Sequence, residues 1–474
     1  MLSIRKALLA AIVVPFLSLG AAPAFADTIF DAMAKAYENN PDLNAARAGL
    51  RATDEGVAIA KAGWRPQISG FVQKSVNKYD LNLYGRTEST NPITGQKSKI
   101  EDKYGFNTLQ AGITITQQIF DGFQTLNNVK AAESTVYSER ARLRATEIQT
   151  LLAAAQAYAN IARDQQIVSI RKQNIAFLKE QVNAARARLD VGEGTRTDVS
   201  LAQAELAQAQ ALLANAEYQL KNSLAVYTQI VGDAAKGVKQ PKPITNKLPK
   251  SIDSAVAIGW REHPQIIANM HAIDAAGYEV KSAEGAMLPG VVIQGQLAGN
   301  RGNNPFTELN TYSSSSVTAR LNVPIYQGGA DHAQVRQYKE RLGQQRILLD
   351  SVRLEVQKTI VSGMAQYEAS KAAIAASQQQ LNAANEALNG TIEERKVGQA
   401  TTVDVLNAQA RVLIAKESLV SAQRDAVVAS FAVVAAMGHL TVEHMALKVA
   451  HYDPDVHYKA VKDKWFGLRT VDGR

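Results

Sequence analysis

The chain has 474 residues and no cysteine, which excludes disulfide bonds and lipid attachment at an N-terminal cysteine. Its net charge of +8 is spread along the sequence, so we expect no nucleic-acid partner. Aromatic residues make up only 6% of the chain, which is low for a large conventional core.

The segment 1–26 has the organisation of a secretory signal peptide. Arg5 and Lys6 precede an apolar run over positions 7–19, and a small-x-small cleavage site, Ala24-Phe25-Ala26, follows. The apolar run is too short to span a membrane. We therefore expect the segment 1–26 to be removed after the chain crosses the inner membrane.

The rest of the chain carries one pattern of prolines and glycines twice. Prolines 41 and 66 recur as prolines 264 and 289, and glycines 122, 192 and 232 recur as glycines 328, 398 and 438. The sequence distance between equivalent prolines is constant, and so is the distance between equivalent glycines. The distance is smaller for the glycines, so the two copies differ in the length of one loop. Such self-similarity predicts a duplicated unit of roughly 200 residues. We expect a signal peptide over 1–26, repeat 1 over 27–232, a linker over 233–251, repeat 2 over 252–438 and a C-terminal tail over 439–474.

Each repeat opens with a predicted helix that a proline interrupts. The helix of repeat 1 covers about Thr28 to Gly63, with a break at Asn40-Pro41. Its counterpart in repeat 2 covers about Ile252 to Ala286, with a break at His263-Pro264.

Two predicted strands follow in each repeat. Apolar and polar residues alternate over Val291–Leu297, over Val317–Ile325 and around Ile113, whereas Ile68–Val76 is a weaker candidate. Alternating segments of about ten residues are typical of transmembrane barrels, although half-buried strands of soluble sheets alternate too. The polar segments 88–102 and 300–316 are predicted to be loops between the strands.

A long helix and a shorter return helix complete each repeat. No proline interrupts positions 122–191 or 329–397, which predicts helices of about 68 residues, or about 100 Å. The return helices, Asp198–Val231 and Asp404–Ala436, are about 50 Å long. The opening and return helices stacked end to end would match one long helix. Leucines 206, 213 and 220 with alanines between them predict coiled-coil packing.

Four strands are too few for a closed membrane barrel, since the smallest have about eight. An open sheet edge in lipid would leave backbone groups unpaired, at a cost of several kcal/mol each. The working unit therefore needs several chains, and geometry alone permits two, three or four.

Two segments resemble the periplasmic tip turns of the TolC family of trimeric outer-membrane export channels. They are Val-Gly-Glu-Gly-Thr-Arg-Thr-Asp-Val at 191–199 and Val-Gly-Gln-Ala-Thr-Thr-Val-Asp-Val-Leu at 397–406. The tail, with Tyr452-Asp453-Pro454 and Trp465, resembles members that serve type I protein secretion. The resemblance covers nearly all of the mature chain.

The resemblance implies a mostly α protein with a membrane β-barrel. A homotrimer would form a 12-stranded barrel in outer-membrane lipid and an α-helical tunnel through the periplasm. It would be a passive exit duct for type I protein secretion, drug efflux or both. A periplasmic adaptor (membrane fusion) protein and an inner-membrane ABC or RND-type transporter would open its periplasmic tip.

The same resemblance assigns roles to residues of the tips. Gly192, Thr195, Gly398 and Thr401 would contact the adaptor, although the glycines also serve as ordinary helix caps. Asp404 matches the family's first aperture-lining acid, and a trimer would bring three such carboxylates around one axis, where they attract cations. The second acidic position is Asn407 here, which argues against strong cation selectivity.

The family's closed tip is also pinned by polar links between neighbouring helix pairs. The matching positions are Thr197 and Asp198 on one side, and Arg395 and Ala400 on the other, where relatives carry tyrosine and arginine. Ala400 cannot form such a link. Arg395 could pair with Asp198, or it could belong to a solvated charged run over 393–396. Asp198 could likewise be only a favourable acid in a helix's first turn.

Aromatic residues near the strand ends could form membrane girdles, or they could only pack at the junctions. Trp64, Phe120 and Tyr326 would lie toward the helices, and Tyr84, Tyr104 and Tyr312 toward the opposite end.

Catalytic motifs are missing from the sequence. It contains no Gly-x-Ser-x-Gly elbow, no phosphate loop and no metal-binding histidine pair, so we expect neither an enzyme nor a cofactor. Two other interpretations remain open: a periplasmic coiled-coil adaptor, or a fibrous structural protein without a channel.

Overall fold

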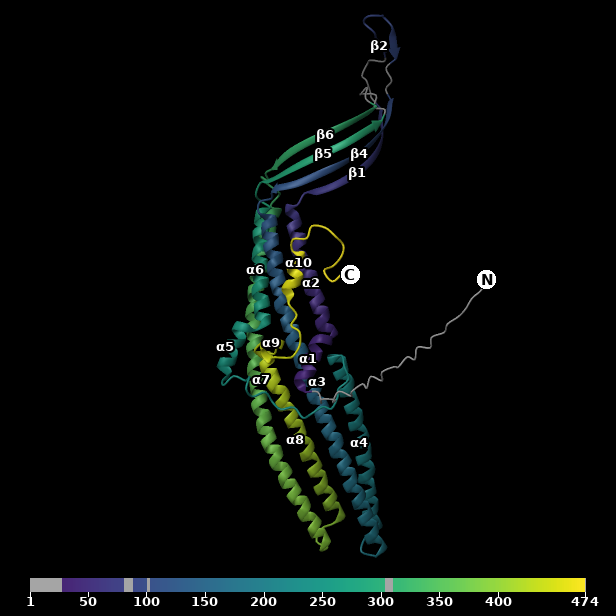
Figure 1. Cartoon of the computed structure of the whole chain (residues 1–474), viewed down its shortest axis with the longest axis vertical. Helices are drawn as coiled ribbons and strands as arrows, with labels where there is room; N and C mark the ends of the chain where they lie inside the picture. Colours follow the sequence, from purple (N-terminus) through teal and green to yellow (C-terminus); the bar gives the residue numbers. More distant parts are fainter. Residues whose placement is uncertain (1–27, 81–87, 100–102, 303–309, 474) are drawn as a thin grey trace, which may run out of the picture.

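The computed structural model describes residues 28–80, 88–99, 103–302 and 310–473, so the predicted signal peptide and Tyr84 lie outside the described residues. The molecule is elongated, with a four-stranded sheet at one end and the turns of two helical hairpins at the other (Figure 1).

The order of elements is the same in both halves of the chain. The first half contains α1 (Ile29–Asn39), α2 (Pro41–Lys61), the 3-10 turn η1 (Ala62–Trp64), β1 (Gln67–Asp80), β4 (Lys103–Phe120), α3 (Gln124–Asp190) and α4 (Arg196–Val231). The second half contains α5 (Ile252–Glu262), α6 (Pro264–Gly285), β5 (Gly290–Gly302), β6 (Thr311–Asn322), α7 (Ala330–Lys396) and α8 (Thr402–Ala436). The tail adds α9 (Val442–Met445) and α10 (Pro454–Val461).

Three details differ from the sequence prediction. The predicted loop over 300–316 is shorter at both ends, because β5 extends to Gly302 and β6 begins at Thr311. The segment 88–102 is not a plain loop, because β2 (Glu88–Thr90) and β3 (Lys97–Lys99) pair within it as a hairpin. The strand β6 ends at Asn322, so Val323 and Ile325 lie beyond it. Pro324 between them has no N–H to donate to a strand ladder.

The predicted end-to-end stacking of helices is present at mid-height. Asn40 caps α2, where its Oδ1 accepts from the Leu43 N–H at 3.0 Å, and its Nδ2 donates to the carbonyl of Ile230 at 2.9 Å. The end of α4 therefore meets the start of α2. Only α2 extends the column, because the break at Pro41 lets α1 pack beside α3 and α4 instead.

The main hydrophobic core surrounds this level. Tyr158 of α3, Phe431 of α8 and Ile360 of α7 are fully buried there. The linker closes over the core, since the Tyr158 hydroxyl donates to the Lys239 carbonyl at 3.1 Å. Within the described residues one helix, α8, is long and apolar enough to span a membrane by composition, but 61% of its most apolar window is buried inside the molecule. It is therefore a core helix of the bundle.

Small residues set the distance between helices below the core. Ala202, Ala209 and Ala216 of α4 are buried, whereas the leucines of the predicted seam at 206, 213 and 220 are only half-buried. Each long helix has 67 residues, or about 100 Å. The alanine side of the seam thus lets α4 lie close against α3 along the hairpin.

The sheet has the antiparallel order β1-β4-β5-β6 and one apolar face. Its register places Ile68 opposite Ile115, Ile113 opposite Leu297, and Val291 opposite Leu321. These side chains share one face because direction alternates along a strand. The face is exposed in the single chain, with Val72 at 77% and Val317 at 82%. Polar residues such as Gln73, Thr114, Gln296 and Thr318 occupy the other face.

The aromatic residues at the junction differ in their surroundings. Trp64 and Tyr326 are exposed, at 48% and 81%, while Phe120 packs edge to face on Phe123 with ring centroids 5.2 Å apart. Tyr312 at the other end of the sheet is 47% exposed, and the side chain of Tyr104 lies outside the described part of the chain.

Candidate functional site: the hairpin tips and the contact between the hairpins

The two tip turns have the same geometry. Each long helix ends at a valine, and the following glycine, Gly192 or Gly398, has φ of 78°. The next residue closes the turn onto the end of the helix: the Glu193 N–H donates to the Arg188 carbonyl at 2.9 Å, and the Gln399 N–H donates to the Glu394 carbonyl at 2.9 Å. A left-handed φ favours glycine, so both glycines are needed as helix caps whatever else they do.

A capping box starts each return helix. The Asp198 N–H donates to Thr195 Oγ1 at 3.1 Å, and the Thr195 N–H donates to Asp198 Oδ2 at 3.1 Å. Thr401 and Asp404 repeat both bonds, at 3.2 and 2.8 Å. The threonine hydroxyls hold the pKa of both aspartates below the usual range. Both carboxylates are therefore charged at neutral pH.

The predicted docking residues lie at the surface of the tips. Gly192, Thr195, Gly398 and Thr401 are exposed. The turns that contain them, between α3 and α4 and between α7 and α8, lie at the end of the molecule far from the sheet (Figure 1). The valines before the glycines, Val191 and Val397, are not among the predicted docking residues, yet each is 71% exposed. The sequence could have indicated these two valines, because an apolar residue occurs at the same position of both turns, where no hydrophobic core is available to bury it. Each tip thus presents one apolar side chain beside a rigid turn.

The predicted aperture residues share this end of the molecule. Asp404 and Asn407 are exposed on the first turns of α8, and Thr197 is exposed on the first turn of α4. Their roles in an aperture stay predictions.

Arg395 has different surroundings from both predicted ones. Its side chain is buried, with 8% exposure, so it is not part of a solvated run. It donates from Nη1 to Gln181 Oε1 of α3 at 2.6 Å, and within the described part of the chain it forms no ion pair with Asp198. Burial disfavours an unpartnered cation, and Gln181 supplies an uncharged acceptor that the sequence analysis overlooked.

Residues of the second hairpin still affect the pKa of Asp198. The nearby Thr402 side chain helps to lower the pKa of Asp198, and the charge of Arg395 adds a weaker attraction. Arg395 therefore contacts Gln181 of the opposite hairpin in place of the predicted direct pair with Asp198, and Asp198 bonds to Thr195 of its own turn.

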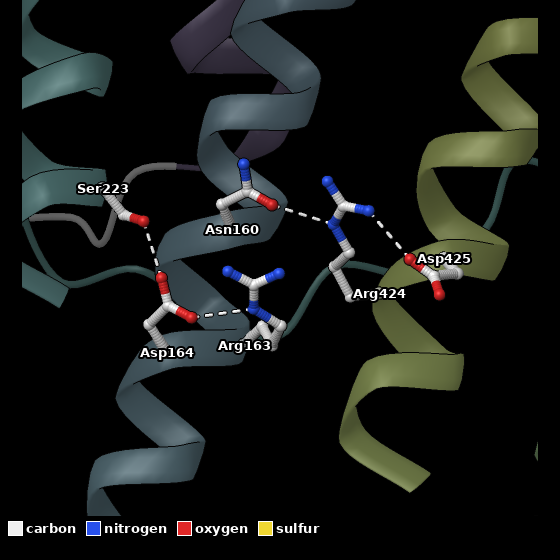
Figure 2. Close-up of polar contacts among 6 residues, drawn as sticks. All are labelled: Asn160, Arg163, Asp164, Ser223, Arg424 and Asp425. Atoms are coloured by element: carbon white, nitrogen blue, oxygen red, sulfur yellow. Dashed lines mark hydrogen bonds and ion pairs between the residues drawn. The ribbon is translucent and has the colours of Figure 1, made fainter. Parts of the chain in front are cut away.

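The link between Arg395 and Gln181 is one of several polar contacts between the two hairpins. Higher up, Arg424 of α8 donates from Nε to Asn160 Oδ1 of α3 at 2.8 Å, and from Nη1 to Asp425 at 2.8 Å (Figure 2). Within the first hairpin, Asp164 accepts from Ser223 at 2.6 Å and from Arg163 at 2.7 Å (Figure 2).

Two more contacts lie between these levels. Arg171 pairs with Glu417 of α8 at 2.9 Å, and Gln409 of α8 donates to Asn174 at 2.8 Å. We call the four contacts the inter-hairpin ladder: Asn160–Arg424, Arg171–Glu417, Asn174–Gln409 and Gln181–Arg395. The α3 members, at positions 160, 171, 174 and 181, are separated by nearly whole helical turns and so share one face. That spacing was the signal in the sequence that could have revealed the ladder.

Comparison with known proteins agrees with this geometry. The profile of the family described as outer membrane efflux protein matches residues 32–233 and 261–439. The chain belongs to this family of outer-membrane channel proteins. The match in two segments also agrees with the duplicated architecture.

Individual relatives include both efflux and secretion proteins. The chain is 45% identical over 451 residues to the outer membrane efflux protein BepC of Brucella suis, covering 95% of this chain and 94% of BepC. It is 25% identical to the alkaline protease secretion protein AprF of Pseudomonas aeruginosa, over 86% and 84% of the two chains. The crystal structure of the Campylobacter jejuni CmeC outer membrane channel has the same fold, with a TM-score of 0.75, 15% identity and coverage of 92% and 89%.

The protein is therefore an outer-membrane export channel component with a large periplasmic body. The predicted TolC-like fold class, family and location are confirmed. The alternatives of a periplasmic adaptor or a fibre without a channel find no support. Among the described residues, no group of three or more histidine, aspartate or glutamate side chains could hold a metal ion.

Proposed function

We propose that three copies of this chain form one duct, and that the duct passively releases cargo delivered by an inner-membrane transporter. The observation that carries the proposal is the open sheet. Its apolar face is exposed, and β1 and β6 each have one neighbouring strand among the described residues. In lipid such edges must be paired, so each β6 would pair with β1 of the next subunit.

The helices favour the same assembly. The backbone of Gly122 touches that of Gly285, since a Cβ on Gly122 would lie 2.1 Å from the Gly285 carbonyl oxygen. The equivalent residue of repeat 2, Gly328, faces open space in the single chain. A second copy would fill that space with its α2, which is the counterpart of α6. Both repeats would then have equivalent neighbours, as a closed ring requires.

We also propose that the tips bind a periplasmic adaptor and that the inter-hairpin ladder holds the closed state. Gly192, Thr195, Gly398 and Thr401 would form the docking turns, with Val191 and Val397 as apolar anchors. Opening would move the second hairpin away from the first and break the ladder near Arg395. Thr197, Asp198, Asp404 and Asn407 would then line or border the aperture.

The partners of such a duct are an adaptor and an ABC or RND-type inner-membrane transporter. Relatives are named for efflux and for alkaline protease secretion, which supports type I secretion, drug efflux or both for this chain. A passive duct needs neither cofactor nor catalysis, and cargo choice would lie with the transporter.

Three measurements test the proposal. The protein extracted in detergent should run as a trimer that heat converts to a monomer, and it should give discrete conductance steps in planar bilayers. Capture of the intact complex from crosslinked cells should yield an adaptor and one transporter. A chain that stays monomeric and soluble without detergent would contradict the duct.

A further inference from the structure

The end of the tail carries an exposed apolar cluster. Trp465, Phe466 and Leu468 are 64%, 89% and 102% exposed. These three large apolar side chains lie close together in the sequence, and Phe466 and Leu468 bury almost nothing in the single chain. Such an exposed group usually marks an interaction surface.

Contacts with the first repeat fix the height of this cluster. Arg65 donates to the Lys464 carbonyl at 2.8 Å, and its guanidinium lies 4.8 Å from the centre of the Trp465 ring. Lys61 pairs with Asp463 at 2.6 Å. Because β1 starts at Gln67, the tail is attached where the helices lead into the sheet, and it runs beside α2 just beneath the sheet (Figure 1).

The preceding tail helix is held as firmly. His457 of α10 contacts the buried Asp54 of α2, with Nδ1 2.9 Å from Oδ2. Arg140 of α3 pairs with Asp455 at 2.6 Å. The cluster therefore cannot slide along the helices without breaking these contacts.

The chemistry of the segment fits a lipid surface. The apolar face of the sheet begins at Ile68, at the start of β1, so the cluster lies close to the height at which the lipid-facing surface of an outer-membrane protein begins. Tryptophan favours the membrane–water interface. The segment 459–469 also contains four basic side chains and one acidic one, and basic segments beside a membrane attract anionic headgroups.

We propose that residues 462–471 form a membrane-surface anchor that inserts Trp465, Phe466 and Leu468 among phospholipids of the periplasmic leaflet of the outer membrane. The inference rests on the outer-membrane location of the sheet and goes beyond the channel function. It gives the tail a role in fixing the periplasmic body against the membrane around the barrel.

Single-tryptophan variants test the anchor, because the chain has three tryptophans. The full-length W64F/W260F protein keeps only Trp465, and the W64F/W465F protein keeps only Trp260. Trp260 is a matched control, since it is 47% exposed but belongs to α5, which lies near the middle of the molecule and away from the sheet (Figure 1). Both are reconstituted into phosphatidylethanolamine–phosphatidylglycerol vesicles with bromines at shallow acyl positions, and flotation verifies insertion of the barrel.

In floating vesicles, Trp465 fluorescence should be quenched by the brominated lipid and shifted to the blue, while Trp260 stays unchanged. Equal responses of the two tryptophans would overturn the anchor without touching the channel function. Unchanged Trp465 fluorescence in brominated lipid, together with crosslinking of a photoreactive label at position 465 to a neighbouring subunit, would assign the cluster to a subunit contact and overturn the anchor too.

A second variant tests the charges. Replacing Lys459, Lys462 and Arg469 with glutamine should reduce the Trp465 quenching in vesicles that contain phosphatidylglycerol. The same change should have a smaller effect in purely zwitterionic vesicles. If Trp465 of this variant is quenched as strongly as Trp465 of the parent in both kinds of vesicle, the basic residues do not contribute to the anchor.

Discussion

Asn40 and His263 occupy equivalent helix caps in the two repeats, and only the histidine can change its charge near neutral pH. His263 Nδ1 accepts from the Gln265 N–H at 3.2 Å, which requires that nitrogen to be unprotonated. Burial lowers the pKa of His263 to about 4. Since an unfolded histidine titrates near pH 6.5, the unfolded chain binds the proton first as the pH falls.

We therefore predict that His263 contributes stability above pH 6.5 and that this contribution is lost as the pH falls toward about 4. The loss is at most about 3 kcal/mol per subunit. His263→Asn should flatten the dependence of Tm on pH between 7 and 4.5, measured by circular dichroism of the trimer in detergent. Asn40→His is the reciprocal variant and should steepen it. Identical slopes for the parent and His263→Asn would refute the assignment.

Asp198 and Asp404 form the same capping box, so they provide a matched pair for the aperture. We predict that Asp404→Asn lowers the cation-over-anion permeability ratio roughly twofold, because a ring of carboxylates attracts cations. Asp198→Asn disturbs an equivalent cap and should lower the ratio less than Asp404→Asn does. Asn407→Asp should raise it. The measurement is the reversal potential of single channels in a salt gradient, and equal effects of Asp404→Asn and Asp198→Asn would attribute them to the cap alone.

At the scale of elements, the inter-hairpin ladder joins two helix pairs that are otherwise held mainly at the core. Buried residues of the lower hairpins form only small apolar clusters, such as Leu178 with Ala209 and Leu406. Polar contacts therefore carry much of the specific attachment between the hairpins near the tips. A hydrogen bond to a charged group contributes about 1.5–3 kcal/mol when it is buried.

We predict that Arg395→Ala raises single-channel conductance and opening frequency, because it removes the contact with Gln181 nearest the tip. Gln181→Ala should act in the same direction. Lys396→Ala is the control, since Lys396 is exposed and pairs with Glu393 in its own helix. Asp198→Ala tests the direct link expected from the sequence, and the structure leads us to expect a smaller change from it. Equal conductance of the Arg395→Ala variant and the parent would show that the inter-hairpin ladder does not hold the channel closed.

At the scale of the whole molecule, the two repeats agree strand for strand. Gln73 of β1 lies opposite Gln110, and their counterparts Gln296 and Ser316 lie opposite each other too. The pairing of β4 with β5 should therefore recur between β6 and β1 of the next subunit. In β4 and β5 the observed pairs include Ala111–Gly299 and Gly112–Ala298. The equivalent pairs expected between subunits are Val317–Val76 and Thr318–Ser75. This register also keeps the apolar faces aligned, which a slip of one residue would not.

We predict that V317C/V76C or T318C/S75C yields disulfide-linked subunits on oxidation, in a chain that has no cysteine of its own. Both pairs are needed because hydrogen-bonded and non-hydrogen-bonded positions alternate and bring side chains to different distances. The shifted pair T318C/V76C is the control, since its side chains point to opposite faces. Denaturing gels without reductant report the result, and crosslinking by the shifted pair alone would refute the register.

The sequence by itself determined most of the architecture. Prolines and glycines repeated at fixed offsets marked the helix breaks and the tip turns, because both residue types restrict or extend the backbone locally. Alternation predicted the strands for the same local reason. Asp198 and Asp404 marked the starts of the return helices, because an acid is favoured in a helix's first turn. The repeat boundaries and the roles of the tip residues stay predictions.

Tertiary structure decided the contacts between distant segments. Arg395 meets Gln181 rather than Asp198, and His457 meets Asp54, because packing of separate helices chooses among many polar partners of similar chemistry. Likewise, the tail's apolar cluster could be proposed as a membrane anchor only because contacts with Lys61 and Arg65 place it beneath the sheet. Local patterns fix the elements of this chain, whereas burial and helix packing select which side chains touch across them.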